Sequence, residues 1–406
     1  MKIMKEIRYW SQGLLLPIYW LSYAFPRNKK LWLCGSSFGK RFADNPKYLY
    51  LYLSQYRKEQ VRVLWISKDK GIVDLLRDNG YLAYHNRSLR GIWACLRAGV
   101  YLYDNYSKDI SFWLSGGALK VNLWHGVGNK KINYDNRFDR VRHPKNRWES
   151  FRTYLRRLSD EKPYHYTLAT SPVKKKIFAS AFRTGEDHII EDGLPRNDVL
   201  LHSDIQNLYT EQEQALLKRI TDWKQQELTI SCYMPTFRKS ETKFFDVVDL
   251  QRLNDFLHKE HMMLLMKLHP KSALKHRFEE LAYPNILVVD PEVDPYTFLK
   301  HVELLITDYS SIYTDFMLLD RPVVGFYYDY ELYSTETRDC YFDFDEYMPE
   351  LKAKDMEELT KAIRQVRKED ICREKRRKSR DMMFSKQDGR ACSSIYEKIQ
   401  KILETR

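Results

Sequence analysis

Short apolar runs alternate with helical patterns along the chain, from about residue 31 onward. In the first half, apolar runs and helical patterns follow one another at residues 31–34, 47–56, 61–66, 70–79 and 99–103. A second series of apolar runs, again separated by helical patterns, occupies residues 228–233, 262–268, 286–289, 304–307 and 323–326. Strands that alternate with helices of this length predict parallel sheets joined by right-handed crossovers.

The length of the chain indicates two domains. Its 406 residues exceed what one ordinary hydrophobic core organises. We expect one domain over residues 31–210 and a second over 211–387, joined by a stretch that glycine and proline interrupt. The two remaining segments are residues 1–30 and a helix over 388–406, which could cross back to the first domain.

Polar residues suited to phosphate chemistry follow several of the apolar runs. These residues are His125, Arg238, Lys267 with His269, and Ser310 with Ser311. In an open α/β sheet, ligands gather outside the carboxyl ends of the strands, so we expect these side chains to converge on one crevice. The two serines also fall where a helix begins, and unpaired N–H groups there attract anions.

The same segments resemble a known family. The motifs are, in order, Trp124-His125-Gly126 with Lys130-Lys131, Gly193-Leu194-Pro195-Arg196-Asn197-Asp198, Pro235-Thr236-Phe237-Arg238, Lys267-Leu268-His269-Pro270 and Thr307-Asp308-Tyr309-Ser310-Ser311. Together they resemble the CDP-glycerol glycerophosphotransferases of teichoic acid and capsule synthesis, from about residue 31 to the end. The chain departs from the family pattern at Val127-Gly128-Asn129, where Thr-Pro-Leu is usual, and at Lys267, where Arg is usual.

The resemblance implies a GT-B-like α/β fold, in which two doubly wound, Rossmann-like domains face each other across a cleft. The domain at 31–210 would then bind the acceptor and the domain at 211–387 the CDP-activated donor. The implied reaction moves a polyol phosphate, glycerol phosphate first, from the CDP-polyol to a hydroxyl of a lipid-linked or polymer acceptor, and CMP leaves.

Such a reaction needs a base for the hydroxyl and positive charge for the diphosphate. We assign the base to His125, because it follows a strand of the first domain and a free imidazole has a pKa of about 6.5. His269 is the second catalytic candidate. The expected donor-binding residues are Arg238, Lys267, Ser310, Ser311 and Asp315.

Asp315 lies one helical turn beyond Ser311 and is expected to contact polyol hydroxyls, as the resemblance also implies. Asp308 is interpreted as a helix cap. Lys130, Lys131 and Arg196 are assigned to acceptor or membrane contacts. The carboxylates are too few to predict a dedicated Mg²⁺ site, so we expect neither a metal nor a cofactor.

Composition favours an anionic partner, because 68 Lys and Arg outnumber 55 Asp and Glu and give a net charge of +13. Between Lys130 and Arg157, ten basic residues accompany three acidic ones, with aromatic residues among them. This stretch is either a solvated helical hairpin or a flap that touches lipid, diphosphate or polymer. No RNA-binding signature accompanies it, so a nucleic-acid partner is not expected.

The apolar, aromatic stretch at residues 13–25 is too short to span a bilayer, which takes roughly 20 residues. Basic residues flank it, namely Lys2, Lys5, Arg8, Arg27, Lys29 and Lys30. The pattern fits an interfacial segment lying in the headgroups, or a first helix packed on its own domain. The first interpretation predicts a peripheral protein on the cytoplasmic face of the bacterial plasma membrane.

Three alternatives remain at this point. A ribitol phosphate transferase would use CDP-ribitol in the same reaction. A GT-B glycosyltransferase would move a sugar from a nucleotide-sugar, and would not need the Thr-Phe-Arg and Leu-His-Pro segments in this form. A basic scaffold or polymer-binding protein without enzymatic activity would leave His125 and His269 without a role.

Overall fold

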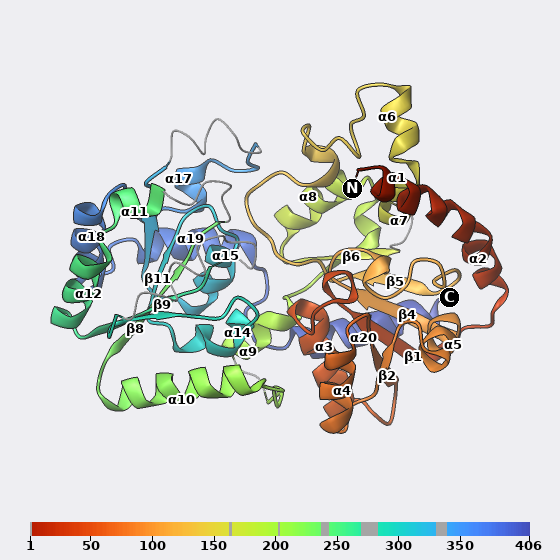
Figure 1. Cartoon of the computed structure of the whole chain (residues 1–406), viewed down its shortest axis with the longest axis horizontal. Coiled ribbons are helices and arrows are strands. Elements are labelled where there is room, and N and C mark those ends of the chain that lie inside the picture. Colours follow the sequence, from red (N-terminus) through yellow and green to blue (C-terminus); the bar gives the residue numbers. More distant parts are fainter. Residues whose placement is uncertain (1, 162–164, 202–203, 237–242, 269–282, 330–338) are drawn as a thin grey trace.

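The computed structural model contains two α/β domains, which lie side by side in Figure 1. It describes every residue except 1, 162–164, 202–203, 237–242, 269–282 and 330–338. The first sheet has seven strands in the order β3-β2-β1-β4-β5-β6-β7, and the second has six in the order β10-β9-β8-β11-β12-β13. Neighbouring strands run parallel in both sheets. The predicted pair of doubly wound halves is confirmed.

The first sheet forms from apolar runs that helices cover on both faces. Its strands are β1 (Asn28–Gly35), β2 (Arg62–Ser67), β3 (Ala83–His85), β4 (Ala98–Tyr103), β5 (Leu119–Asn122), β6 (Tyr166–Ala169) and β7 (Ile189–Glu191). The covering helices are α3 (Asp44–Tyr56), α4 (Lys70–Asp78), α5 (Leu89–Arg97) and α8 (Pro172–Phe182). All six residues of β4 are buried, as expected of a central strand in a sheet covered on both sides.

The second sheet follows the same plan. Its strands are β8 (Thr229–Met234), β9 (Met262–Met266), β10 (Ile286–Val288), β11 (Leu304–Thr307), β12 (Val323–Phe326) and β13 (Leu351–Ala353). Its helices include α10 (Glu211–Gln225), α11 (Lys243–Val247), α12 (Leu250–Lys259), α14 (Pro295–Phe298), α15 (Ile312–Phe316), α17 (Phe344–Tyr347), α18 (Met356–Lys368) and α19 (Arg373–Met383). Each β–α connection places the carboxyl ends of the strands at one edge of the sheet.

The last helix, α20 (Ala391–Glu404), packs against α3 of the first domain. Its first turn is held by the Asp198 carboxylate on α9 (Asp198–Leu201), which accepts hydrogen bonds from the N–H groups of Ala391 at 2.9 Å and Cys392 at 2.8 Å. Burial raises the pKa of Asp198 to about 6. The chain therefore returns to its first domain after completing the second.

The N-terminal segment comprises α1 (Lys2–Ser11), α2 (Leu16–Leu21) and two short 3₁₀ turns. It packs on its own domain: Tyr19 is buried and stacks on Phe112, with ring centroids 4.5 Å apart. Trp10 stacks on Phe151 of α6 (Arg147–Arg152) at 4.9 Å. Helix α7 (Tyr154–Glu161) follows α6 beside this segment (Figure 1).

The same segment leaves the side chains of Leu14, Trp20 and Leu21 more than half exposed. Among the described residues, no helix has both the length and the hydropathy that a membrane span requires. Arg27, one of the expected membrane-facing cations, is used inside the fold, where its guanidinium donates to the carbonyl oxygens of Ser22 and Cys95 at 2.8 and 2.7 Å.

Candidate active site

A pocket of about 340 Å³ lies between the two domains, at the carboxyl ends of β5, β8 and β11. The first domain lines it with residues 124–130, Ile132 and Phe178, and the second with Pro235, Thr236, residues 309–311 and Tyr341. Among the described residues that line the pocket there is no carboxylate, whereas Lys130 and His125 are present. The lining therefore suits an anionic ligand.

His125 follows β5, as predicted, and its side chain is exposed to the pocket. Its Nδ1 lies 3.1 Å from the backbone oxygen of Asp104. A carbonyl oxygen can only accept a hydrogen bond, so Nδ1 carries a proton, and in the neutral ring Nε2 is the nitrogen with the lone pair. The Asp104 position is fixed in turn, because its carboxylate accepts from the Ser36 hydroxyl at 2.7 Å and the Ser37 N–H at 3.1 Å. The contact with Asp104 therefore holds the His125 ring in the orientation and tautomer that a general base needs.

The backbone before and after His125 adopts unusual angles. Trp124 has φ of 52°, which is costly for a bulky residue, and Gly126 has φ of 143°. The amide of Asn45 on α3 holds the bend by donating to the backbone oxygens of Leu123 at 3.2 Å and Trp124 at 2.7 Å. This bend turns the His125 ring out of the sheet edge toward the pocket.

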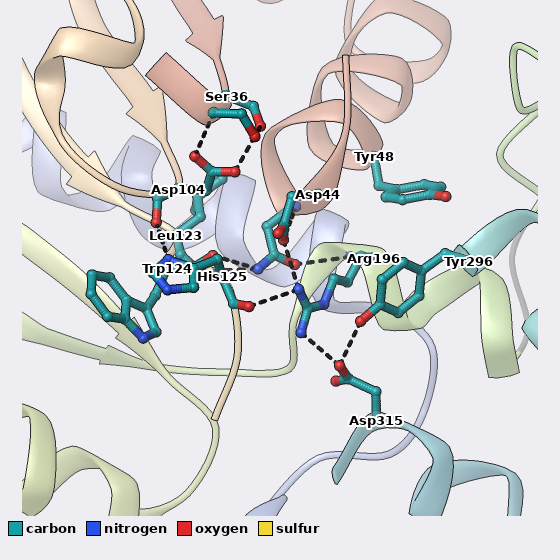
Figure 2. Close-up of polar contacts among 12 residues, drawn as sticks. Ser36, Asp44, Tyr48, Asp104, Leu123, Trp124, His125, Arg196, Tyr296 and Asp315 are labelled. Carbon is teal, nitrogen blue, oxygen red and sulfur yellow. Dashed lines mark hydrogen bonds and ion pairs between the residues drawn. The ribbon is translucent and has the colours of Figure 1, made fainter. Parts of the chain in front are cut away.

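Arg196 contradicts the prediction that it contacts the acceptor or the membrane. It lies on the 3₁₀ turn Pro195–Asn197 and is buried. Its guanidinium donates to Asp315 Oδ2 at 2.6 Å, to Asp44 Oδ1 at 2.8 Å and to the His125 backbone oxygen at 2.9 Å (Figure 2). Burial opposes its charge, but the carboxylates of Asp315 and Asp44 outweigh this effect and raise the pKa of Arg196 well above its usual value. The arginine therefore connects the two domains directly behind His125.

Asp315 lies on α15 and is buried. Its Oδ2 also accepts from the hydroxyl of Tyr296 at 2.5 Å. Asp315 does not line the pocket, so contact with a polyol would require the ion pair with Arg196 to open. Its role as a polyol contact stays a prediction.

Ser310 and Ser311 line the pocket opposite the His125 turn. A methyl group added to Gly128 would come within 3.1 Å of the Ser311 Cβ, which shows how closely the two segments approach. Asp308 is not the cap of α15, whose N-cap residue is Ser311. Instead, its Oδ1 accepts a hydrogen bond from the Thr236 N–H at 2.8 Å and links the ends of β11 and β8.

Lys267 is buried at the end of β9 and does not line the pocket. Its Nζ donates to the backbone oxygen of Asp290 at 2.8 Å. Burial, with a smaller contribution from Arg41, lowers the pKa of Lys267 to about 8. Arg238 and His269, the other two predicted residues of this domain, lie outside the described residues.

Lys130 and Lys131 belong to a loop that joins the domains beside the pocket. Lys130 lines the pocket and forms an isolated antiparallel β-bridge with Cys340, and the Lys131 N–H donates to the Asp339 oxygen at 2.8 Å. Next to them, the Asn129 side chain donates to the Phe342 backbone oxygen at 3.1 Å and accepts from its N–H at 2.8 Å. The loop thus pairs with the second domain.

Three buried residues of the site were missed as functional candidates from the sequence: Asn45, Asp104 and Lys174. Lys174 on α8 donates from Nζ to the Gly128 backbone oxygen at 2.8 Å, and burial lowers its pKa to about 7. Asp104 had a signal, because it directly follows the predicted strand at residues 99–103. Within the described residues, no three His, Cys, Asp or Glu side chains come together in a way that could hold a metal ion. The expectation of a metal-free reaction stays a prediction.

Comparison with known proteins places these residues in a family context. The family model described as CDP-Glycerol:Poly(glycerophosphate) glycerophosphotransferase matches residues 18–401. A teichoic acid poly(glycerol phosphate) polymerase of Bacillus spizizenii is 29% identical over 379 residues, which cover 88% of this chain and 89% of that protein. A teichoic acid glycerol-phosphate transferase of Staphylococcus aureus is 26% identical, with coverages of 92% and 94%.

The fold also has a solved counterpart. The structure of the wall teichoic acid polymerase TagF superposes with a TM-score of 0.74 at 22% sequence identity. The match covers 100% of this chain and 97% of the TagF chain. The GT-B-like arrangement predicted from the sequence is confirmed.

Proposed function

The chain belongs to the CDP-glycerol:poly(glycerophosphate) glycerophosphotransferase family, and from this premise we propose that it transfers glycerol phosphate from CDP-glycerol to an acceptor hydroxyl. CMP is the leaving group, and the product belongs to a teichoic acid or a capsule polymer. The observation that carries the proposal is His125, whose Nδ1 is held by the Asp104 carbonyl and whose side chain lines a pocket with no carboxylate among its described lining residues.

His125 Nε2 takes the proton of the acceptor hydroxyl as the oxygen attacks the phosphorus of the glycerol phosphate. The new P–O bond forms while the P–O bond to the phosphate of CMP breaks, and the electron pair leaves with CMP. General bases of this kind contribute about 10²–10⁴-fold to rate. The Asp104 carbonyl keeps the imidazole oriented throughout, because it holds Nδ1–H.

The donor contacts the second domain. Arg238 and His269 bind the diphosphate, His269 as the second catalytic residue, and Ser310 and Ser311 donate from the turn opposite His125. Lys267 contributes positive charge from behind the pocket lining, since it lies at the end of β9 and does not reach the pocket itself. A TagF variant of the same fold was soaked with CDPG, which supports a CDP-glycerol donor.

The acceptor is a lipid-linked or polymeric chain presented at an anionic membrane surface. Two observations support this part of the proposal. The N-terminal segment exposes Leu14, Trp20 and Leu21, and the neighbouring α6 exposes Trp148 and Phe151. Aromatic side chains with nearby basic residues favour the headgroup region, and each cation near an anionic surface contributes about 1 kcal/mol.

One experiment separates the candidate donors. The purified protein is incubated with CDP-glycerol, CDP-ribitol or a nucleotide-sugar, together with a lipid-linked acceptor, and the product is analysed by mass spectrometry. The expected result is CMP release and a mass increase of one or more glycerol phosphate units. If a product forms only from CDP-ribitol or only from the nucleotide-sugar, CDP-glycerol is not the donor.

A further inference from the structure

The turn from His125 to Asn129 carries backbone donors that no protein atom uses. Within the described part of the chain, none of the N–H groups of residues 125–129 has a hydrogen-bond partner. Gly126, Val127 and Asn129 are nevertheless buried, and the whole turn lines the pocket. Since an N–H group buried without a partner is costly, these donors face the pocket.

The carbonyl groups of the same turn are fixed from the opposite side. The bonds run from Asn45 Nδ2 to the Trp124 oxygen at 2.7 Å, from Arg196 Nη1 to the His125 oxygen at 2.9 Å and from Lys174 Nζ to the Gly128 oxygen at 2.8 Å. All three donor residues are buried. In a planar trans peptide, each C=O points away from the N–H of the next residue. The N–H groups of His125, Gly126 and Asn129 therefore point away from the buried donors, of which Figure 2 labels Arg196.

Glycine leaves space in front of these donors. Gly126 has φ of 143°, and a Cβ at this position would lie 3.1 Å from Arg196 Nη2. A Cβ at Gly128 would lie 3.1 Å from the Ser311 Cβ, where it would narrow the space between the domains. Successive backbone N–H groups in a turn form a concave site for an anion, which agrees with the absence of carboxylates among the described lining residues.

We propose that the turn 125–129 binds the phosphoryl group during its transfer, through the N–H groups of His125, Gly126 and Asn129. The inference rests on the proposed function. As the acceptor oxygen attacks phosphorus and the bond to CMP breaks, negative charge is spread over the other phosphoryl oxygens. Donors already oriented toward them stabilise this state. Lys174 acts as a positioning residue, because it holds the Gly128 carbonyl and thereby directs the Asn129 N–H.

The test compares Lys174→Met with Lys176→Met. Both variants lose one lysine from α8, but Lys174 is buried and Lys176 is exposed. Lys174→Met is expected to lower kcat by about 10–100-fold, somewhat less than the loss of a whole oxyanion donor, and to weaken inorganic pyrophosphate binding, measured by calorimetry, by a similar factor. Its melting temperature should not fall, since a buried charge has been removed. Lys176→Met should resemble the wild type in all three measurements.

The outcomes separate this inference from the proposed function. If the wild type transfers glycerol phosphate but Lys174→Met matches Lys176→Met in kcat and pyrophosphate affinity, the turn is not the phosphoryl site. If the wild type releases no CMP from CDP-glycerol, yet pyrophosphate binding depends on Lys174, the anion site stands and the proposed donor is wrong. If Lys174→Met does not fold, Gly128→Ala gives the same test, because its methyl group occupies the space in front of the N–H groups of the turn. Unchanged pyrophosphate affinity in Gly128→Ala would overturn the inference.

Discussion

Replacing Arg196 by methionine should destabilise the protein through the charge that it leaves behind. The Asp315 carboxylate is buried, and its remaining described partner at Oδ2 would be the Tyr296 hydroxyl. Removing one partner of a buried ion pair costs about 3–5 kcal/mol, whereas a hydrophobic replacement of the whole pair is often neutral. Loss of the second ion pair, between Arg196 and Asp44, adds less to this destabilisation, because the Asp44 side chain is 22% exposed.

The prediction is therefore a loss of about 3–5 kcal/mol in unfolding free energy for Arg196→Met. Asp315→Asn added to Arg196→Met should recover about 1–3 kcal/mol, because the neutral amide removes the unpaired charge. Urea denaturation followed by tryptophan fluorescence measures both, since the chain has nine tryptophans. A double-mutant cycle then isolates the coupling between the two residues.

Arg364→Met provides the matched control. Arg364 pairs with Glu260 at 2.8 Å, but its side chain is 52% exposed, so its loss should cost about 0–1 kcal/mol. If the losses of unfolding free energy from Arg196→Met and Asp315→Asn add in the double variant, the two residues are not coupled, and the inter-domain ion pair does not stabilise the protein. A loss no larger than that of the control would also refute the reasoning.

Four further predictions concern the chemistry and the membrane. His125→Ala should lower kcat by about 10²–10⁴-fold, measured by CMP release, with nearly unchanged CDP-glycerol affinity, measured by calorimetry. Normal turnover in this variant would show that His125 is not the general base. Arg238→Ala and His269→Ala should weaken the affinity for the donor, which titration with CDP-glycerol checks. The pKa of Lys174 is lowered to about 7 in the folded protein, so above that pH the unfolded state binds more protons than the folded state. The free energy of unfolding should therefore rise between about pH 7 and 10. Lys174→Met should remove this rise, which urea titrations at several pH values measure. Deleting residues 1–26 should release the protein from anionic liposomes in sedimentation assays, and equal binding would assign the segment a purely structural role.

The two-domain fold could be predicted because buried parallel strands are continuous apolar runs. The predicted strand at 304–307 coincides with β11, and the predicted run at 323–326 coincides with β12. Strands β3, β6, β7 and β13 were not predicted. They are about as short as β11 and β12, but they are less uniformly apolar, since they include His85, Thr167, Glu191 and Lys352. Segments this short show no periodicity of their own, and they become strands because a neighbouring strand offers them hydrogen bonds.

The candidate site was predictable only where chemistry follows a strand directly. His125, Ser310 and Ser311 do so, and all three line the pocket. Arg196 could not be interpreted correctly, because its partner Asp315 is 119 positions away and nothing local distinguishes a buried guanidinium from a solvated one. Lys174 resembled an ordinary surface lysine beside two others on the same helix. Long-range pairing of charges is a property of the assembled domains and leaves no periodic pattern in the sequence.

Arg196 links the contact between the domains to the position of His125. One side chain joins Asp315 of the second domain to the His125 carbonyl of the first, so the ion pair and the active-site turn share a donor. Opening the domains would break the bond to Asp315, because that carboxylate belongs to the other domain. The bond to His125 would then depend on Asp44 alone to keep the guanidinium in place. The position of His125, the proposed base, is therefore best defined when the domains are closed, which is also when the pocket lined by both of them is complete.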